Sequence, residues 1–96
     1  MNLTIFTAPK PFTNSHIAII QLNAIQSWLH LGEDVRVILV GEETGMHAVA
    51  AELGIDHLPQ VQRNRDGTPL VSSIFELARQ HSSDPLLAYL NADILL

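Results

Sequence analysis

The sequence of 96 residues contains no cysteine, few basic residues and no long apolar run. Without cysteine the chain can form no disulfide, use no thiol nucleophile and build no cysteine-ligated zinc site. Lysine and arginine together number five and are scattered along the chain, so they make no basic face for a nucleic acid or an anionic membrane. No apolar stretch approaches the roughly 20 residues that span a bilayer, so no transmembrane segment is expected.

Short motifs of several enzyme classes are also missing. The sequence has no G-x-G-x-x-G after its first predicted strand, no G-x-x-x-x-G-K-[ST] and no G-x-S-x-G, which disfavours dinucleotide binding, a P-loop and a serine-hydrolase elbow. It also lacks the acidic cluster or phosphate loop of a flavodoxin-like module. No two histidines flank a glutamate at i, i+4, so a histidine-ligated metal is not expected. Residues Met1–Thr7 do not resemble a signal peptide, and the expected location is cytoplasmic.

What the chain does contain is the composition of a small folded domain. Its apolar fraction is 47% and its charged fraction is 16%, which is typical of a globular chain and not of a disordered one. A length of 96 residues suits one domain and not two. Residues 1–96 are therefore predicted to form a single domain.

Strands and helices are predicted to alternate along the sequence. Runs rich in branched and aromatic residues predict strands at Leu3–Thr7, Val35–Val40, Ile55–Leu58 and Leu86–Leu90. The last of these is expected to be buried. Helically spaced apolar residues predict a helix in each interval. These stripes are Ile17, Ile20, Ala24, Ile25, Trp28 and Leu31, then Met46, Val49, Ala50 and Leu53, and then Leu70, Val71, Ile74, Leu77, Ala78 and His81.

Polar residues complete the description of these helices. The first helix has three N-cap candidates in a row at residues 13–15, and the third has Thr68 as N-cap followed by a proline at N1. Gln21 is expected on the polar side of the first helix, opposite its apolar stripe. Trp28 is expected in the core between the helix and the sheet.

The order β-α-β-α-β-α-β with short connections predicts an α/β fold with parallel strands. We expect a three-layer Rossmann-like sheet with strand order 3-2-1-4, which has a switch point between the first and fourth strands. Ligands of such sheets bind beyond the carboxyl ends of the strands. The loop at Thr7–Lys10 and the segment at Asn91–Asp93 should therefore lie side by side.

The segment after the last predicted strand carries two candidate metal ligands. Asn91 and Asp93 are spaced i, i+2, so on an extended backbone their side-chain oxygens point to the same side. Hard divalent cations prefer such oxygens, and a bound cation could in turn hold a diphosphate. The alternative is that the aspartate serves as a turn residue or a helix cap.

Four segments together resemble the start of GT-A-type glycosyltransferases of the family-2-like kind. They are Thr4–Phe12, Ala24–Leu29, Arg63–Val71 and Tyr89–Ile94. The order and spacing of these segments carry the resemblance, which covers the whole chain but only the amino-terminal half of such an enzyme. It implies half of a GT-A fold that binds a nucleoside diphosphate sugar, the donor from which the family transfers a hexosyl group.

The resemblance also implies roles for individual residues near the first two strands. Thr7, Ala8 and Pro9 match the loop that contacts the nucleotide in the family. Glu42 matches the acidic position after the second strand, although a glutamate there more commonly favours the next helix through its dipole.

Further candidates lie in the second half of the chain. Asn64 and Thr68, with Gly67, match a segment that can approach the nucleotide or sugar, and a structural cap is the equal alternative. Asn91 and Asp93 match the Asp-x-Asp that coordinates Mn²⁺ or Mg²⁺ at the diphosphate. The first aspartate of that motif is asparagine here, a neutral ligand, which weakens the expected affinity for the metal.

The acceptor-binding half of such an enzyme, with its catalytic base, follows the Asp-x-Asp. This chain ends soon after Asp93, so the expectation is a truncated nucleotide-sugar-binding domain without transfer activity of its own and without an assigned catalytic residue. The alternative is a catalytically silent α/β module that acts through self-association or a protein partner. The apolar residues Leu90, Ile94, Leu95 and Leu96 favour a homo-oligomer formed through the C-terminal strand.

Overall fold

Four parallel strands form the sheet that the sequence predicts. In a computed structural model, which describes residues 3–59, 71–82, 84 and 86–94, the strands are β1 (Leu3–Thr7), β2 (Val35–Val40), β3 (Asp56–Leu58) and β4 (Leu86–Tyr89). Their order across the sheet is β3-β2-β1-β4, and each neighbouring pair is parallel. The prediction of an α/β, Rossmann-like fold with strand order 3-2-1-4 is confirmed.

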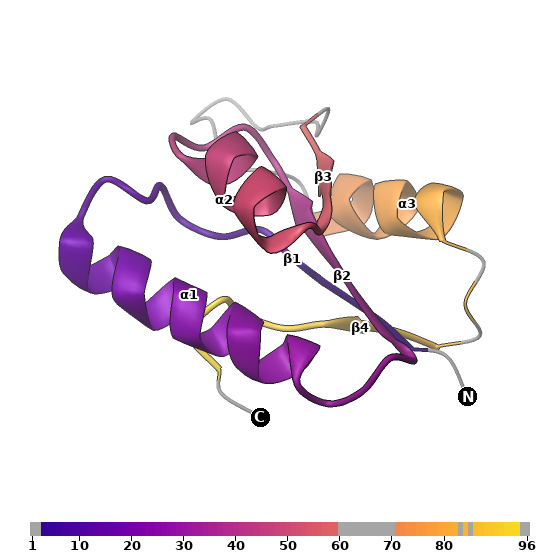
Figure 1. Cartoon of the computed structure of the whole chain (residues 1–96). Coiled ribbons are helices and arrows are strands. Elements are labelled where there is room, and N and C mark those ends of the chain that lie inside the picture. Colours follow the sequence, from indigo (N-terminus) through magenta and orange to yellow (C-terminus); the bar gives the residue numbers. More distant parts are fainter. Residues whose placement is uncertain (1–2, 60–70, 83, 85, 95–96) are drawn as a thin grey trace.

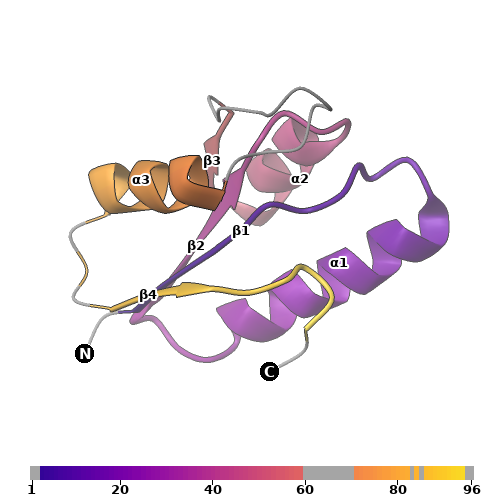
Figure 2. The same ribbon diagram turned by 180° about the vertical axis from the view of Figure 1, so that it is seen from behind.

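Helices cover both faces of this sheet. They are α1 (Ser15–Leu29), α2 (Met46–Leu53) and α3 (Val71–His81). Helices α1 and α2 lie on one face (Figure 1), and α3 lies on the other, which Figure 2 shows from behind. Within the described ranges, none of the helices has the length and apolar character needed to cross a membrane.

Helix α1 begins where a side chain satisfies its first backbone donors. Asn14 is its N-cap, and the Asn14 Oδ1 atom accepts from the backbone N–H groups of His16 and Ile17 at 2.9 and 3.1 Å. Of the three predicted caps, the structure uses this one. The predicted cap of the third helix, Thr68, lies outside the described residues.

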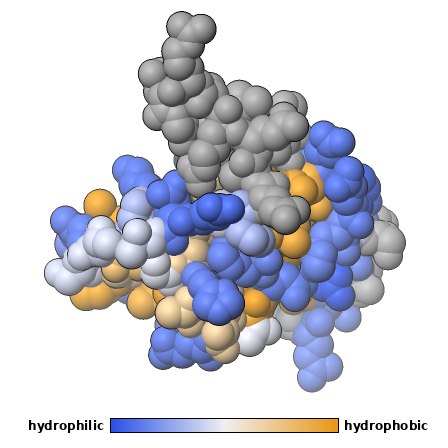
Figure 3. Space-filling model, turned by 90° about the horizontal axis from the view of Figure 1, so that it is seen from above, coloured by the Kyte–Doolittle hydropathy of each residue, from blue (hydrophilic) through white to orange (hydrophobic). Residues whose placement is uncertain are grey.

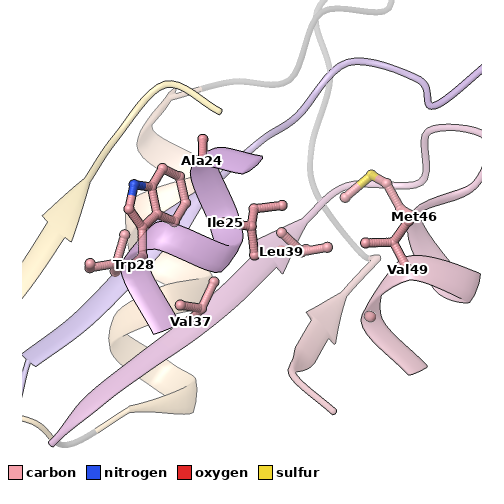
Figure 4. Packing of buried hydrophobic residues seen from close by; sticks show 9 residues of the cluster. Ala24, Ile25, Trp28, Val37, Leu39, Met46 and Val49 are labelled. Carbon is pink, nitrogen blue, oxygen red and sulfur yellow. The ribbon is translucent and has the colours of Figure 1, made fainter. Parts of the chain in front are cut away.

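The core consists of two apolar clusters, one on each face of the sheet. On the first face, Ile25 and Trp28 of α1 pack toward Val37 and Leu39 of β2 (Figure 4). The second cluster contains Phe6, Ile38, Val40, Ile74 and Ala78. Each large side chain buried in this way stabilises the fold by roughly 1.5–3 kcal/mol. Because β2 contributes to both clusters, its sequence is almost wholly apolar.

Several side chains depart from the predicted helix faces. Gln21, expected on the polar side of α1, is buried, whereas Ile20 and Leu31 of the predicted stripe are 36% and 49% exposed. Leu31 is exposed because α1 ends at Leu29 and the chain has left the helix. His81, expected in the buried stripe of α3, has a side chain that is 39% exposed. Its Nε2 atom lies 3.1 Å from Asp56 Oδ2, so a polar partner explains its position at the helix end.

The prediction that the last strand is buried was wrong. Leu86 and Tyr89 of β4 are 48% and 38% exposed. Because β4 is at the edge of the sheet, it pairs with β1 on one side only. The Tyr89 ring still packs edge-on against Phe6, with ring centroids 5.6 Å apart.

Two threonines of β1 have contrasting hydroxyl environments. Thr4 Oγ1 donates to Asp84 Oδ2 at 2.6 Å and lies 2.7 Å from Ser82 Oγ, which ties the segment after α3 to β1. Thr7, at the other end of the strand, is equally buried, but its Oγ1 atom has no hydrogen-bond partner among the described residues. A buried hydroxyl without a partner lowers stability, whereas a bonded one contributes to it.

We expect valine substitutions at these two positions to have opposite effects. Thr7→Val removes an unpaired hydroxyl at nearly constant shape and should raise the free energy of unfolding by about 1 kcal/mol. Thr4→Val removes the hydrogen bonds of this hydroxyl with Asp84 Oδ2 and Ser82 Oγ and should lower it by about 1–3 kcal/mol. Urea unfolding followed by circular dichroism measures both. A Thr7→Val protein that is less stable than the parent would contradict the unpaired state of that hydroxyl.

Candidate functional site

A pocket of about 410 Å³ lies where β1 and β4 end. The backbone N–H of Leu90 donates to the carbonyl of Phe6 at 3.2 Å, so the two chain segments leave the sheet side by side. This confirms the predicted meeting of the loop after β1 with the segment after β4. The described lining residues are Ala8, Pro9, Lys10, Ile17, Ile20, Gln21, Asn91, Ala92 and Asp93.

The buried amide of Gln21 fixes the loop after β1. Its Oε1 atom accepts from the backbone N–H of Lys10 at 2.7 Å, and its Nε2 atom donates to the Lys10 carbonyl at 3.0 Å. The side chain therefore pairs with the Lys10 backbone much as a neighbouring strand would. Burial of this polar group is tolerated because both ends of the amide have partners.

Helix α1 also holds the opposite wall of the pocket. The indole Nε1 atom of Trp28 donates to the carbonyl of Ile94 at 2.8 Å, and Figure 4 shows the ring nitrogen on the side of the C-terminal segment. Trp28 itself is fully buried, as predicted. Its hydrogen bond thus anchors the chain after β4 to the core.

The segment that carries Asn91 and Asp93 is a turn and not an extended strand. The backbone N–H of Ile94 donates to the Asn91 carbonyl at 3.2 Å, which closes a turn centred on Ala92 and Asp93. The expected parallel arrangement of the two side chains on extended backbone was therefore wrong. The reason is that the ladder with β1 ends at Leu90, after which nothing keeps the chain extended. Both side chains are exposed and line the pocket.

The walls of the pocket differ in chemical character. Ile17 and Ile20, one helical turn apart on α1, make an apolar wall. The loop contributes Lys10 and the turn contributes Asn91 and Asp93, which are polar or charged residues. The pocket can therefore accept a ligand that has both an apolar part and charged or hydroxyl groups.

The other predicted site residues lie elsewhere. Thr7 is fully buried and is not part of the pocket lining that the structure describes. Glu42 belongs to a second pocket of about 500 Å³ at the same edge of the sheet, lined by Glu42, Glu43, Gly45, His47, Ala48, His57 and Pro59. Asn64 and Thr68 lie outside the described residues. The structure therefore brings together Ala8, Pro9, Asn91 and Asp93 among the predicted set.

The loops after β1 and β2 are joined to each other. The backbone N–H of Phe12 donates to the Thr44 carbonyl at 2.8 Å. At Gly45 the φ angle is +89°, and an added Cβ would lie 2.9 Å from the Phe12 Cβ, so glycine is required there for both conformation and space. In the second pocket, the His57 Nε2 atom lies 2.7 Å from the Gly41 carbonyl, so this ring already has a partner.

A metal site is the least supported part of the predicted chemistry. Asn91 and Asp93 offer one neutral amide and one carboxylate, both in an exposed turn. The described part of the chain contains no group of three or more His, Cys, Asp or Glu side chains that could hold a metal ion. Mg²⁺ is commonly held by one or two carboxylates, with its other oxygen ligands supplied by water and phosphate, so this pair does not hold a cation without a bound diphosphate and water. Binding of Mn²⁺ or Mg²⁺ stays a prediction.

The predicted site residues did not include Lys10, Ile17, Ile20 and Gln21, although Lys10 belongs to the loop that the sequence placed at the ligand-binding edge. The isoleucines were assigned to the core because their spacing is that of a buried stripe. One available signal was the position of Lys10, a cation between two prolines in the loop at the switch point.

We expect Gln21→Met to lower stability, because it leaves the N–H and carbonyl of Lys10 without their partner. The free energy of unfolding should fall by about 1–3 kcal/mol, as measured by urea unfolding. Gln26→Met is the matched control, since Gln26 is exposed on the same helix and its substitution should change stability by less than about 0.5 kcal/mol. Equal stability of both variants would show that the Gln21 amide does not hold the loop.

Comparisons with known proteins do not identify a family. No protein-family profile, no curated protein and no solved structure shows a significant match to this chain. The resemblance to GT-A-type glycosyltransferases therefore stays a prediction from its motifs. What the structure itself supports is a small α/β domain with a four-stranded parallel sheet of order 3-2-1-4.

Proposed function

We propose that this chain binds a nucleoside diphosphate sugar in the pocket between the loop after β1 and the turn after β4, as the donor-binding part of a glycosyltransferase. The observation that carries the proposal is the meeting of Ala8–Lys10 with Asn91–Asp93 in one pocket. This pocket lies at the switch point of a parallel sheet, where such folds bind ligands. We propose binding only, with no transfer step.

The chemistry of the pocket suits the parts of such a ligand. Apolar side chains at Ile17 and Ile20 can contact the faces of a base or a sugar ring. The Asp93 carboxylate can accept hydrogen bonds from sugar hydroxyls, and the Asn91 amide can donate or accept. The Lys10 ammonium offers a positive charge for a phosphate.

The size of the pocket agrees with a ligand of this class. Small-molecule sites are commonly about 300–1,000 Å³, and this one is about 410 Å³.

Isothermal titration calorimetry tests this proposal directly. The purified chain is titrated with UDP, GDP, UDP-glucose and GDP-mannose, each with and without Mn²⁺. We expect binding of at least one of these ligands in the parent protein. Ile20→Trp places an indole in the pocket wall and should weaken that binding by tenfold or more, because it occupies ligand space.

Ile19→Trp is the matched control for the substitution in the wall. Ile19 is 58% exposed and does not line the pocket, so the same change there should leave affinity unaltered. No binding of any of the four ligands under either condition would contradict the proposed function. Equal losses in both tryptophan variants would show that the ligand binds at another place.

A second candidate function is association with a second copy through β4, and the exposed edge of the sheet favours it. Strand β4 pairs with β1 on one side only, and Leu86 and Tyr89 are exposed on it. Phe75 of α3 adds a further apolar ring, 45% exposed and 6.2 Å from Tyr89 between centroids. Figure 3 shows another face of the molecule, where hydrophobic residues form separate patches among hydrophilic ones. The β4 edge itself offers both apolar side chains and unpaired backbone groups for association.

Sedimentation velocity over a range of protein concentrations tests this second candidate. Pairing through β4 predicts a dimer whose population rises with concentration. Leu86→Lys should abolish it, because a charged side chain on an edge strand opposes pairing with another strand. Ile19→Lys, a change on the exposed side of α1, should not affect it. A parent protein that remains monomeric at the highest concentration would exclude the dimer.

A further inference from the structure

Among the described lysine and arginine residues, Lys10 is the one whose charged group has neither an ion pair nor a hydrogen bond. Among the described arginines, the Arg36 Nε atom lies 4.0 Å from Asp56 Oδ2, and the Arg79 Nη1 atom donates to the Asp84 carbonyl at 3.0 Å. Lys10 has no ion pair and no side-chain hydrogen bond with any described residue. Lys10 is an exposed residue and lines the pocket. A cation left without a partner in a pocket is available to an anionic ligand.

The backbone of Lys10 is held unusually firmly for a loop residue. Pro9 and Pro11 flank it, and a proline ring fixes the φ angle. Pro9 is also buried. The Gln21 amide binds both the N–H and the carbonyl of Lys10. The start of the side chain is therefore fixed at the pocket wall, which reduces the conformational entropy that a ligand must overcome.

The polar groups opposite Lys10 suit a metal poorly. Asn91 stands where the resembled motif has an aspartate, so the turn presents a single carboxylate, that of Asp93. Within the described lining, the pocket thus has one basic and one acidic side chain. Since the whole chain carries a net charge of −5, an anion needs a local positive charge to bind here.

We infer that Lys10 neutralises the diphosphate of the ligand in this pocket and takes the place that a divalent cation has in metal-dependent sites. The inference rests on the proposed function, because it concerns the same ligand. A lysine ammonium has three donors and acts as a point charge, which suits phosphate oxygens of variable geometry. Asp93 then faces the hydroxyl groups of the ligand and not a metal.

The effect of Asp93→Asn on UDP affinity distinguishes binding through a divalent cation from binding through Lys10. If a cation bridges Asp93 and the diphosphate, Asp93→Asn removes a metal ligand and weakens the binding of UDP. If Lys10 neutralises the diphosphate, the same variant removes a negative charge beside an anion. UDP should then bind at least as tightly as to the parent.

Calorimetric titration with UDP and with inorganic pyrophosphate, in the presence of EDTA, tests the inference. We expect both to bind the parent protein without a divalent cation. Lys10→Gln should weaken both by about tenfold to a hundredfold, as for loss of a hydrogen bond to a charged group. Lys10→Arg keeps the charge and should retain most of the affinity. Circular dichroism and the urea midpoint show whether each variant folds as the parent does.

The possible results separate this inference from the proposed function. UDP binding that requires Mn²⁺ and is unchanged in Lys10→Gln would overturn the role of Lys10 and leave the proposed function standing. Pyrophosphate binding that depends on Lys10, together with no binding of any nucleotide, would overturn the proposed function alone. Absence of both UDP and pyrophosphate binding in EDTA would overturn the inference.

Discussion

The pocket depends on the position of helix α1, which forms its apolar wall and holds the neighbouring loop and turn through two buried hydrogen-bonding side chains. Gln21 binds the backbone of Lys10, and Trp28 binds the carbonyl of Ile94. The two residues are seven positions apart, about two turns of helix, so they lie on the same side of α1. The segments that they hold come from opposite ends of the chain. A shift of α1 along the sheet would therefore displace both walls together.

Apolar packing and hydrogen bonding contribute differently to the placement of α1 and of the pocket segments. Ala24 and Ile25 pack in one apolar cluster with residues of β2. Hydrophobic burial is not directional, so it would permit small sliding movements of α1 along the sheet. The bonds of Gln21 and Trp28 are directional and connect to backbone atoms of the loop after β1 and of the segment after β4. They fix where these two segments lie relative to the helix. A residue that contacts no ligand can thus determine where ligand-contacting groups lie.

The sequence was sufficient for the sheet but not for the details of the pocket. Strands and helices follow from the periodicity of neighbouring apolar residues, and the strand order follows from general rules for connections. The burial of Gln21 has another origin, because its partner is a backbone eleven positions away that only the folded loop brings near. The turn at Asn91–Asp93 likewise depends on where the ladder with β1 ends. The spacing of residues in the sequence therefore does not predict the burial of Gln21 or the turn at Asn91–Asp93.

Strand β4 connects the two candidate functions. Its free side is the edge of the sheet, and the turn that follows it forms a wall of the pocket. A strand from another chain that paired with β4 as far as Tyr89 would reach the start of that turn and would limit its movement. Such ordering lowers the entropy cost of binding a ligand in the pocket. By linkage, a bound ligand would favour the pairing to the same extent, so association and ligand binding at this edge would be coupled.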